Sequence, residues 1–596
     1  LNTLEGMESY KGHFYNWYDI RSLSPLCPRY ISTVDSGNLV CAMVTVRQAL
    51  KLMPEAPVSP QRVLNGIAHA LAADCYEKAP EDEKKTVFKR AIALTQARCK
   101  PDTRGLCVLR DRLGRLNALL GDDGAAWNRS LKQVQDAIEA LDALMPWLSA
   151  CPDAAKAHAE VMDRICGMHA LRFNAAKAIA LLSSDPSSRE LCDLVFKGHM
   201  AARDRLAAAG PLCDRLTALI DRTDFAVLYD EERELLYIGM DGEGRTGRAH
   251  YDLWTSEARL TSLVAMSKGE VPFDHYRRLG RVPTRYRSHR TLLSWSGTMF
   301  EYLMTRLFVP DAPGSLGETV VRGAVKIQRA YARRLGLPFG MSESGYYAFD
   351  RQLNYQYKAF GVPSIGFKSG LLRERVIAPY ASVLAATVDA HAALENMERL
   401  GKEGALSPFG FYEALDYTPE RIGEGRKVQV VQSAMVHHQG MILCALTNVL
   451  EQSALQKWFM NDPGMRALWG LLEERSIDTW PKALNKIEEL SPPTAVCALP
   501  GRVVKQVQGA HLSQLLSGGS YHVRITATGG GMSTLNGIAL NRWRDDPVLD
   551  DYGLRVYIRL KNQKPFCAMP GPDETLNREE SVEFFPHFAR FTRSKV

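Results

Sequence analysis

Amphipathic helical patterning dominates this 596-residue chain. Residues 60–220 are rich in Ala and Leu at helical spacing, with Arg and Asp between them and Gly or Pro at the breaks. The same periodicity returns from Tyr251 to about Leu490, where helical segments alternate with loops rich in Gly, Pro and aromatic residues. Such spacing places apolar side chains on one face of each helix, and that face must be buried against other helices. The pattern predicts a mainly α-helical protein, a double ring of helical hairpins whose loops form a cleft at one end.

Local signals mark the first long helix and one hairpin. Apolar residues at helical spacing run from Leu39 to Leu52, and Asp35 or Ser36 is placed to cap that helix. Residues 225–240 are typical of two strands around a polar turn, a small β-hairpin insertion. Residues 242–247 then match the glycine pattern of dinucleotide-binding loops. Because this loop follows a hairpin and no alternation of strands and helices comes after it, we expect no nucleotide site there.

The composition changes again near residue 505. Strand-like segments separated by turn residues follow, at 521–526, 555–559 and 588–593. We therefore expect two domains, a helical domain over residues 1–500 and a β-rich segment over residues 505–596 that begins a β-sandwich.

Charge, apolar runs and cysteine spacing exclude several classes of function. The net charge of +7 is modest for this length and is spread along the chain, whereas nucleic acid requires a concentrated basic stripe. No window of 18 apolar residues is present, so no membrane span is expected in this piece. The twelve cysteines lack CxxC spacing, which is typical of reduced thiols in the cytoplasm. The chain begins without an initiator Met, which indicates a fragment or a processed piece.

Two loops each place a glutamate among aromatic and small residues. Glu343 stands in the loop 339–350 and Glu413 in the loop 409–418. Aromatic faces take the C–H side of a pyranose, and polar groups orient its hydroxyls. Breaking a glycosidic bond requires an acid that protonates the leaving oxygen and a carboxylate opposite it, and apolar surroundings raise the pKa of such an acid. The pattern favours a glycoside-processing site, although a loop glutamate is more often a solvated turn residue or a helix cap.

Other polar loops keep two interpretations. His437 and His438 are adjacent, so on a helix they point about 100° apart and are poorly placed to chelate one metal ion. They fit either a buried structural pair or hydrogen bonding to sugar hydroxyls, and we expect no metal. Residues 294–302 and 353–358 are divided in the same way between core packing and substrate binding.

At the level of motifs, the chain resembles the middle, glycoamylase-like domain of bacterial cyclic β-1,2-glucan synthases. The motifs that carry the resemblance are GHFYNWYD (12–19), YISTVDSGN (30–38), YDLWTSEARL (251–260), SWSGTMFEYLM (294–304), SESGYYAFDRQLNYQYKAFGVP (342–363), FGFYEALDYTP (409–419), HHQGM (437–441) and GGGMSTLNGIALNRWRDD (529–546). Between about 60 and 220 the resemblance is weakest, and only helical patterning supports the interpretation there.

The resemblance implies an (α/α)6-barrel that acts without a cofactor as an anomer-retaining transglycosylase, closing linear β-1,2-glucan into a ring. The synthases of this family are large inner-membrane proteins that also carry glycosyltransferase and phosphorylase-like regions. The resemblance therefore places this domain at the cytoplasmic face of the membrane, with a β-1,2-glucan chain as its partner.

Carried onto this chain, the resemblance makes Glu343 and Glu413 the catalytic pair, with Glu343 preferred as acid/base and Glu413 as nucleophile. The expected substrate-lining residues are Asp35, Trp295, Glu301, Tyr346, Tyr347, Asn354, Tyr357, Asp416, Tyr417, His437, His438 and Gln439. Two alternatives stay open, an endo-β-1,2-glucanase that uses water as acceptor and a non-catalytic glucan-binding module. Neither ring size nor oligomeric state follows from the sequence.

Overall fold

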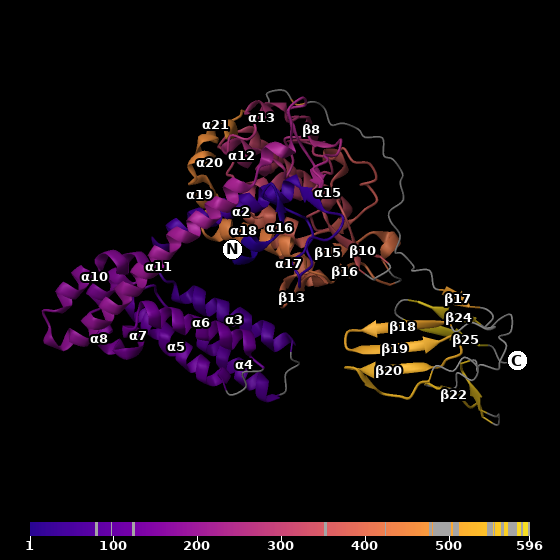
Figure 1. The fold of residues 1–596 in the computed structure, drawn as a ribbon, viewed down its shortest axis with the longest axis horizontal. Helices are drawn as coiled ribbons and strands as arrows, with labels where there is room; N and C mark the ends of the chain where they lie inside the picture. The colour runs from indigo at the N-terminus through magenta and orange to yellow at the C-terminus, as the bar shows by residue number, and fades with distance from the viewer. Residues whose placement is uncertain are drawn as a thin grey trace. The chain divides into compact units, whose positions relative to one another are not determined.

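Contacts divide the chain into a mainly helical unit and a unit of antiparallel strands (Figure 1). The computed structural model describes residues 1–475 except 56, 78–81, 97, 122–125, 351–353 and 423–424, together with 480, 502–504, 512–544, 552–553, 555–561, 565–569, 581–585 and 588–593. The first unit is made of Leu1–Ser344, Ala359–Tyr417 and Gln432–Pro492, and the second of Gly345–Lys358, Thr418–Val431 and Pro493–Val596. The predicted mainly helical chain with a β-rich C-terminal segment is confirmed. The helical pattern predicted over residues 481–490 and the boundary near residue 505 lie outside the described residues.

Two groups of helices make up the first unit. The first group, in chain order, is α2 (Thr33–Leu52), α3 (Pro60–Glu77), α4 (Asp82–Thr95), α5 (Thr103–Gly121), α6 (Asn128–Leu144), α7 (Trp147–Ala150), α8 (Pro152–Ala157), α9 (Ala159–Met162), α10 (Met168–Leu182) and α11 (Arg189–Arg222). The second group is α12 (Arg259–Ser267), α13 (Asp274–Arg278), α14 (Met299–Leu303), α15 (Leu316–Leu335), α16 (Pro379–Ala385), α17 (Ala390–Leu400), α18 (Val436–Leu450), α19 (Ala454–Met460), α20 (Pro463–Ala467) and α21 (Trp469–Leu472). The short α1 spans Asn2–Gly6.

Short antiparallel strand pairs connect these helices. They are β1 (Ser9–Tyr10) with β2 (His13–Phe14), β3 (Tyr30–Ser32) with β6 (Gly239–Asp241), β5 (Leu235–Tyr237) with β4 (Tyr229–Asp230) and β7 (His250–Tyr251), β8 (Pro283–Tyr286) with β9 (His289–Leu292), β12 (Val376–Ile377) with β15 (Ala414–Asp416), and β13 (Leu406–Ser407) with β14 (Gly410–Phe411). The predicted hairpin is present as β4 and β5. Residues Phe225–Leu228 form a 3-10 turn instead of strand, because the Asp224 carboxylate accepts from the N–H of Ala226 and starts a helical turn.

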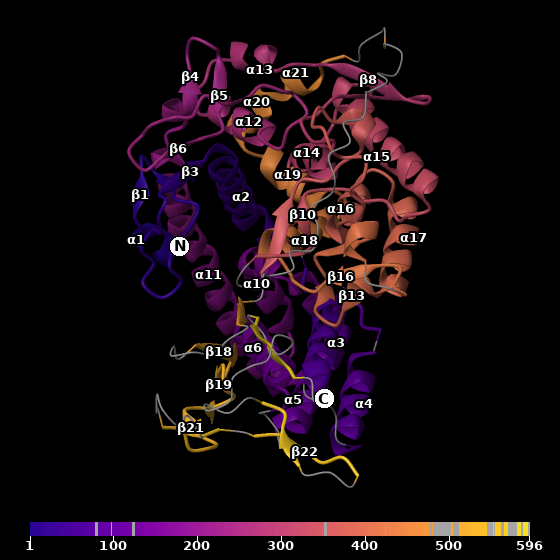
Figure 2. The same cartoon turned by 90° about the vertical axis from the view of Figure 1, so that its right-hand side faces the viewer.

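Helix α2 and helices of the second group pack in an arc, with α2 between α12 and α19. Helix α2 packs against α12 and α19, α19 against α18, α18 against α16, and α16 against α14, as Figure 2 also shows. Where α2 meets α12, a Cβ on Gly37 would lie 1.9 Å from the Thr261 hydroxyl oxygen, so only glycine permits this approach. The start of α2 differs from the prediction, because the helix begins at Thr33. The Ser32 hydroxyl accepts from the N–H of Asp35, so Ser32 does the capping expected of Asp35 or Ser36.

Helices α3 to α11 have a hydrophobic core of their own. Leu64, Leu71, Leu109 and Leu113 are fully buried in it, together with Trp147 at the start of α7. The predicted helices over residues 60–220 are confirmed. Among the described residues of the whole chain, no helix is both long enough and apolar enough to cross a membrane.

The second unit consists of antiparallel strands. They are β10 (Ser344–Phe349), β11 (Tyr355–Lys358), β16 (Gln429–Val431), β17 (Arg502–Val504), β18 (Ser513–Gly518), β19 (Tyr521–Thr526), β20 (Gly531–Leu535), β21 (Ile538–Ala539), β22 (Tyr557–Ile558), β23 (Phe566–Cys567), β24 (Ser581–Phe584) and β25 (Ala589–Thr592). Strands β18 to β21 form one sheet in chain order, and β24 lies between β17 and β25 in another. The strands predicted at 521–526, 555–559 and 588–593 correspond to β19, β22 and β25.

Candidate active site

Glu257 stands in the turn before α12, a helix whose first eight residues are buried. The Ser256 hydroxyl accepts from the N–H of Ala258 at 3.2 Å and so fixes this turn. Burial raises the pKa of Glu257 to about 8, and the charges of Glu301 and Glu343 act in the same direction. Part of Glu257 remains accessible to solvent. It is therefore a carboxylic acid that keeps its proton at neutral pH, in a residue that is not fully enclosed.

A network of hydrogen bonds fixes the loop that carries Glu343. The N–H of Met341 donates to the Gln328 side-chain oxygen at 3.1 Å, and the Gln328 amide donates to the Met341 carbonyl at 2.9 Å. The Tyr380 hydroxyl lies 2.8 Å from the Ser342 hydroxyl and donates to the Glu343 carbonyl at 2.9 Å. Glu343 itself keeps accessible surface. Its backbone position is thus set by three buried side chains, while the residue keeps part of its surface exposed.

Glu413 faces a buried histidine. The His438 Nδ1 lies 2.9 Å and 3.0 Å from the two Glu413 carboxylate oxygens, and the Glu413 side chain has 0% exposure. The His438 ring stacks on Tyr380 with 3.9 Å between centroids and 11° between planes. Burial raises the pKa of Tyr380 well above its usual value, and Glu343, Glu413 and Glu257 add to this. The three glutamates therefore share one cluster around Tyr380, but Glu413 has no surface for direct contact with a ligand.

Glu301 belongs to the same cluster as a structural carboxylate. It accepts hydrogen bonds from the Ser294 hydroxyl, the Ser296 N–H, and both the N–H and the hydroxyl of Thr298, at 2.8–2.9 Å. These four donors fill about as many acceptor positions as a carboxylate offers. Glu301 also completes the capping box of α14 with Thr298. The charge of Glu301 therefore raises the pKa of Glu257, and its carboxylate has little capacity left to accept hydrogen bonds from sugar hydroxyls.

Asp35, Tyr251 and His437 border the cluster. The Asn16 amide donates to the Asp35 carboxylate at 3.2 Å. Burial raises the pKa of Tyr251, and the charges of Glu257, Asp35 and Glu343 add to the effect. Burial lowers the pKa of His437, with His438 adding to the shift and Glu413 and Asp35 opposing it. A neutral imidazole and a protonated phenol are both suited to hydrogen bonding with hydroxyls.

Other residues expected to line the site have different surroundings. The Gln439 amide donates to the Phe411 carbonyl at 3.0 Å, the buried Tyr417 donates its hydroxyl to Glu403, and Asp416 is fully buried in β15.

Trp295 is half exposed, with its indole N–H donating to Asp252 at 2.9 Å. Four more of the expected residues belong to the second unit, namely Tyr346, Tyr347, Asn354 and Tyr357. There Tyr347 packs on Phe349 and Tyr355, and the Asn354 N–H donates to the Asp350 carboxylate at 2.9 Å.

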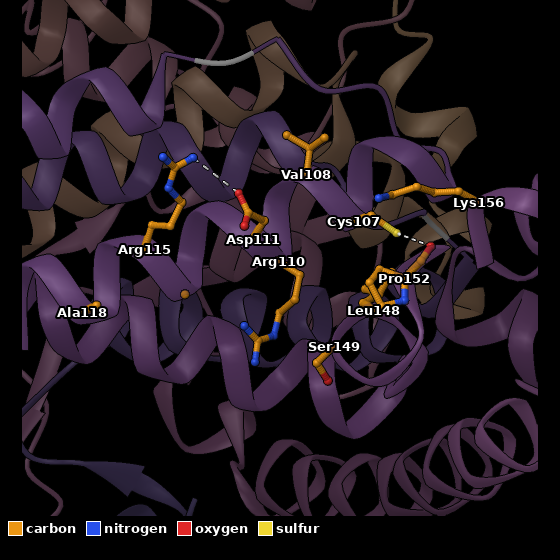
Figure 3. A pocket seen from close by; sticks show the side chains of 11 residues that line it. Cys107, Val108, Arg110, Asp111, Arg115, Ala118, Leu148, Ser149, Pro152 and Lys156 are labelled. Atoms are coloured by element: carbon orange, nitrogen blue, oxygen red, sulfur yellow. Dashed lines mark hydrogen bonds and ion pairs between the residues drawn. The ribbon is translucent and has the colours of Figure 1, made fainter. Parts of the chain in front are cut away.

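A separate cavity of about 680 Å³ opens between α5, α7 and α8, as Figure 3 shows. Its basic side chains each have an acidic neighbour. Arg110 binds Asp142 at 2.7 Å, Arg115 lies 3.6 Å from Asp111, and Lys156 lies 3.1 Å from Asp153. Since these charges are balanced and the lining holds neither an aromatic residue nor a pair of glutamates, the cavity offers less for sugar chemistry than the glutamate cluster.

Two members of the cluster escape the sequence reasoning. Glu257 follows Thr255 and Ser256 just before a helix, where a glutamate is usually interpreted as a capping signal. The available signal was its place inside the motif YDLWTSEARL, which carried part of the family resemblance. Tyr380 gives no signal of its own, because its function depends on Ser342 and His438, which lie 38 and 58 residues away in the chain.

Residues 249–463 match the Glycoamylase family model, and residues 504–596 match the supersandwich domain of glycosyl hydrolase 94. The chain is 35% identical over 578 residues to the cyclic β-(1,2)-glucan synthase NdvB of Rhizobium meliloti (strain 1021). That similarity covers 94% of this chain and 19% of NdvB, so the chain spans about a fifth of the length of this relative. The resemblance to the synthases that the motifs indicated is thereby confirmed.

Solved structures with similarity to the chain include a putative glucoamylase from Bacteroides caccae, with 15% identity and a TM-score of 0.36 over 79% of this chain and 96% of that one. Another is the endo-β-1,2-glucanase from Chitinophaga pinensis, with 13% identity and a TM-score of 0.35 over 70% of this chain and 98% of that one.

Proposed function

We propose that this chain is an anomer-retaining transglycosylase that closes linear β-1,2-glucan into a ring, with Glu257 as acid/base and Glu343 as nucleophile. The observation that carries the proposal is the cluster in which two partly exposed glutamates interact through their charges, while burial raises the pKa of one of them, Glu257, to about 8. The substrate class rests on the similarity to NdvB, whose name gives the glucan.

This assignment keeps Glu343 from the sequence-based pair but makes it the nucleophile instead of the preferred acid/base, and it takes Glu257 in place of Glu413 as its partner. A catalytic carboxyl must touch the glycosidic oxygen or the anomeric carbon, and the Glu413 side chain is fully enclosed against His438. In this proposal Glu413 is a positioning residue. It orients His438, which supports the Tyr380 ring, and Tyr380 in turn holds the Glu343 backbone.

The chemistry then proceeds in two steps. Glu257 donates its proton to the leaving glycosidic oxygen while the Glu343 carboxylate attacks the anomeric carbon and forms a covalent glycosyl–enzyme. Glu257, now ionised, removes a proton from a hydroxyl at the far end of the same glucan, which attacks the anomeric carbon and releases Glu343. Two inversions convert a β-linkage into a β-linkage. Holding both ends of one chain in one cleft raises their effective concentration over that of an external acceptor.

We further propose that the helices form an (α/α)6-barrel over residues 1–500 and that residues 505–596 begin a β-sandwich. The arc of contacts from α12 through α2, α19, α18 and α16 to α14 supports a ring, and the supersandwich match over residues 504–596 supports the second part. The parent protein is proposed to be an inner-membrane synthase with glycosyltransferase and phosphorylase-like regions, in which this piece faces the cytoplasm and needs no cofactor.

The test is incubation of the purified protein with linear β-1,2-glucan. Ring closure gives products that lack a reducing end and resist an exo-acting β-glucosidase. Short reducing oligomers identify a hydrolase instead, and binding without any product identifies a glucan-binding module.

Site variants then separate the three glutamates. Glu257→Gln and Glu343→Gln should each lower kcat by at least about 100-fold. With a β-glucosyl donor whose leaving group departs without protonation, added azide should rescue Glu343→Ala to give an α-glucosyl azide and Glu257→Ala to give a β-glucosyl azide, because only the first variant lacks the nucleophile. Glu413→Ala should give no glucosyl azide at all. An α-azide product from Glu413→Ala would show that Glu413 is the nucleophile and would overturn our assignment.

A further inference from the structure

Two exposed aromatic rings lie together beside the glutamate cluster. Trp295 is 49% exposed and Phe367 is 40% exposed, with 5.6 Å between their ring centroids and 49° between their planes. The Trp295 indole N–H donates to the Asp252 carboxylate at 2.9 Å. An exposed aromatic pair with a carboxylate at its edge combines the two elements that a sugar ring needs, a flat apolar face and a hydrogen-bond acceptor.

Backbone hydrogen bonds hold the two segments that carry these rings together. The N–H of Phe367 donates to the Ser294 carbonyl at 3.0 Å, and the N–H of Lys368 donates to the Trp295 carbonyl at 2.8 Å. The two segments approach so closely at Gly366 that a Cβ there would lie 2.7 Å from the carbonyl carbon of Ser296. Because the backbone under both rings and the Trp295 indole are held before a ligand arrives, binding costs less conformational entropy.

The same backbone connects the aromatic pair to the proposed acid. Ser294 and Ser296, on either side of Trp295, both donate to Glu301, and the charge of Glu301 raises the pKa of Glu257. Asp252 precedes Glu257 by five residues, so their Cα atoms are at most about 18 Å apart. The aromatic pair therefore lies within a few sugar units of the scissile bond.

We infer that Trp295, Phe367 and Asp252 form a glucan-binding subsite outside the catalytic pair, in which a glucose unit stacks on the Trp295 face and donates a hydroxyl to Asp252. The inference rests on the proposed function, since β-1,2-glucan is the ligand. Such a subsite holds a part of the glucan away from the bond that is cut, which is what a ring-closing enzyme needs to retain the second end of its substrate.

The experiment measures binding of long linear β-1,2-glucan by calorimetry in the full chain carrying Glu343→Gln, a substitution that suppresses turnover. Adding Trp295→Ala should raise the Kd about tenfold, as expected when the stacking of one sugar ring on an aromatic face, and the area that it buries, are lost. Trp295→Phe should restore most of the affinity because it keeps a flat ring. Trp469→Ala is the matched control, since the Trp469 indole also donates to a carboxylate, that of Glu473, at 2.8 Å, and its removal should leave the Kd unchanged.

Each outcome has one meaning. If Trp295→Ala binds as tightly as its parent while its circular dichroism is unchanged, the subsite is refuted and the proposed function stands. If the parent carrying Glu343→Gln does not bind β-1,2-glucan at all, the proposed function fails and the subsite with it. Equal losses in Trp295→Ala and Trp469→Ala would show that tryptophan removal disturbs the fold, and would also overturn the inference. In the active enzyme, Trp295→Ala should raise KM for the glucan about tenfold with kcat within about threefold.

Discussion

Replacing Glu257 with glutamine should make the protein more stable at neutral pH while it abolishes turnover. The pKa of Glu257 is about 8 in the folded protein, against an ordinary value of 4.5. Between these two pH values the folded state holds a proton that the unfolded chain has lost. The contribution of Glu257 to stability is therefore fully present below pH 4.5 and decreases as the pH rises towards 8.

The size of the effect follows from the same two values. One pKa unit corresponds to 1.36 kcal/mol, so the 2.5 units between pH 4.5 and pH 7 give at most about 3 kcal/mol. Glutamine is neutral in both states and escapes this penalty. The difference in unfolding free energy between Glu257→Gln and the parent should thus rise by about 1.4 kcal/mol per pH unit above 4.5 and level off near pH 8.

Hydrogen exchange of peptides from α12, followed by mass spectrometry at pH 5, 6, 7 and 8.5, measures the opening free energy where Glu257 sits. Exchange rates are corrected for their intrinsic pH dependence, and Glu139→Gln on the exposed face of α6 serves as control. A difference between variant and parent that stays constant from pH 5 to pH 7, or a variant that is less stable at pH 7, would refute the reasoning. In that case Glu257 would not be the protonated acid of the cluster.

Two further predictions concern the surroundings of the cluster. Tyr380→Phe keeps the ring that stacks on His438 but removes the hydroxyl that holds the Glu343 loop, so kcat should fall about 10- to 100-fold while the thermal midpoint drops by only a few degrees; an unchanged kcat in steady-state assays would contradict this positioning role. Gly37→Ala forces a Cβ against α12 and should lower the free energy of unfolding of the first unit by about 1–3 kcal/mol, measured by urea unfolding. Gly66→Ala in α3 is the control and should change this free energy little, because the nearest side-chain atom to its Cβ is 3.3 Å away. Equal effects of the two substitutions would contradict the packing argument.

The elements that the sequence predicts well are those determined by local patterns. The strand at 521–526 agrees with β19 residue for residue, and α3 to α11 fill the region where apolar spacing is helical. The sequence predicts the start of α2 too late, because Thr33 and Val34, though buried, precede the residues with clear helical spacing. A cap can be satisfied by any nearby hydroxyl, and here Ser32 supplies it.

The site was predictable only in part, because its chemistry depends on contacts between distant segments. The aromatic context of Glu413 correctly indicates burial, but the sequence does not show that His438 takes up both carboxylate oxygens. Glu257 lies 86 residues before Glu343, and its raised pKa comes from burial and from neighbouring charges that no local pattern reveals. Whether the expected residues of the second unit touch substrate stays a prediction.

The burial of helix α12 affects which substitutions can alter the activity of this protein during evolution. Its first eight residues are enclosed by the interior, and the acidic residue at its entrance inherits its position from them. A substitution that adds or removes a methyl group at Leu260 or Val264 would shift Glu257 by a fraction of an ångström, although neither side chain contacts the substrate. Selection for altered turnover should therefore recover substitutions at these buried positions of α12 as readily as at positions in the cleft. A screen restricted to ligand-facing positions would miss them.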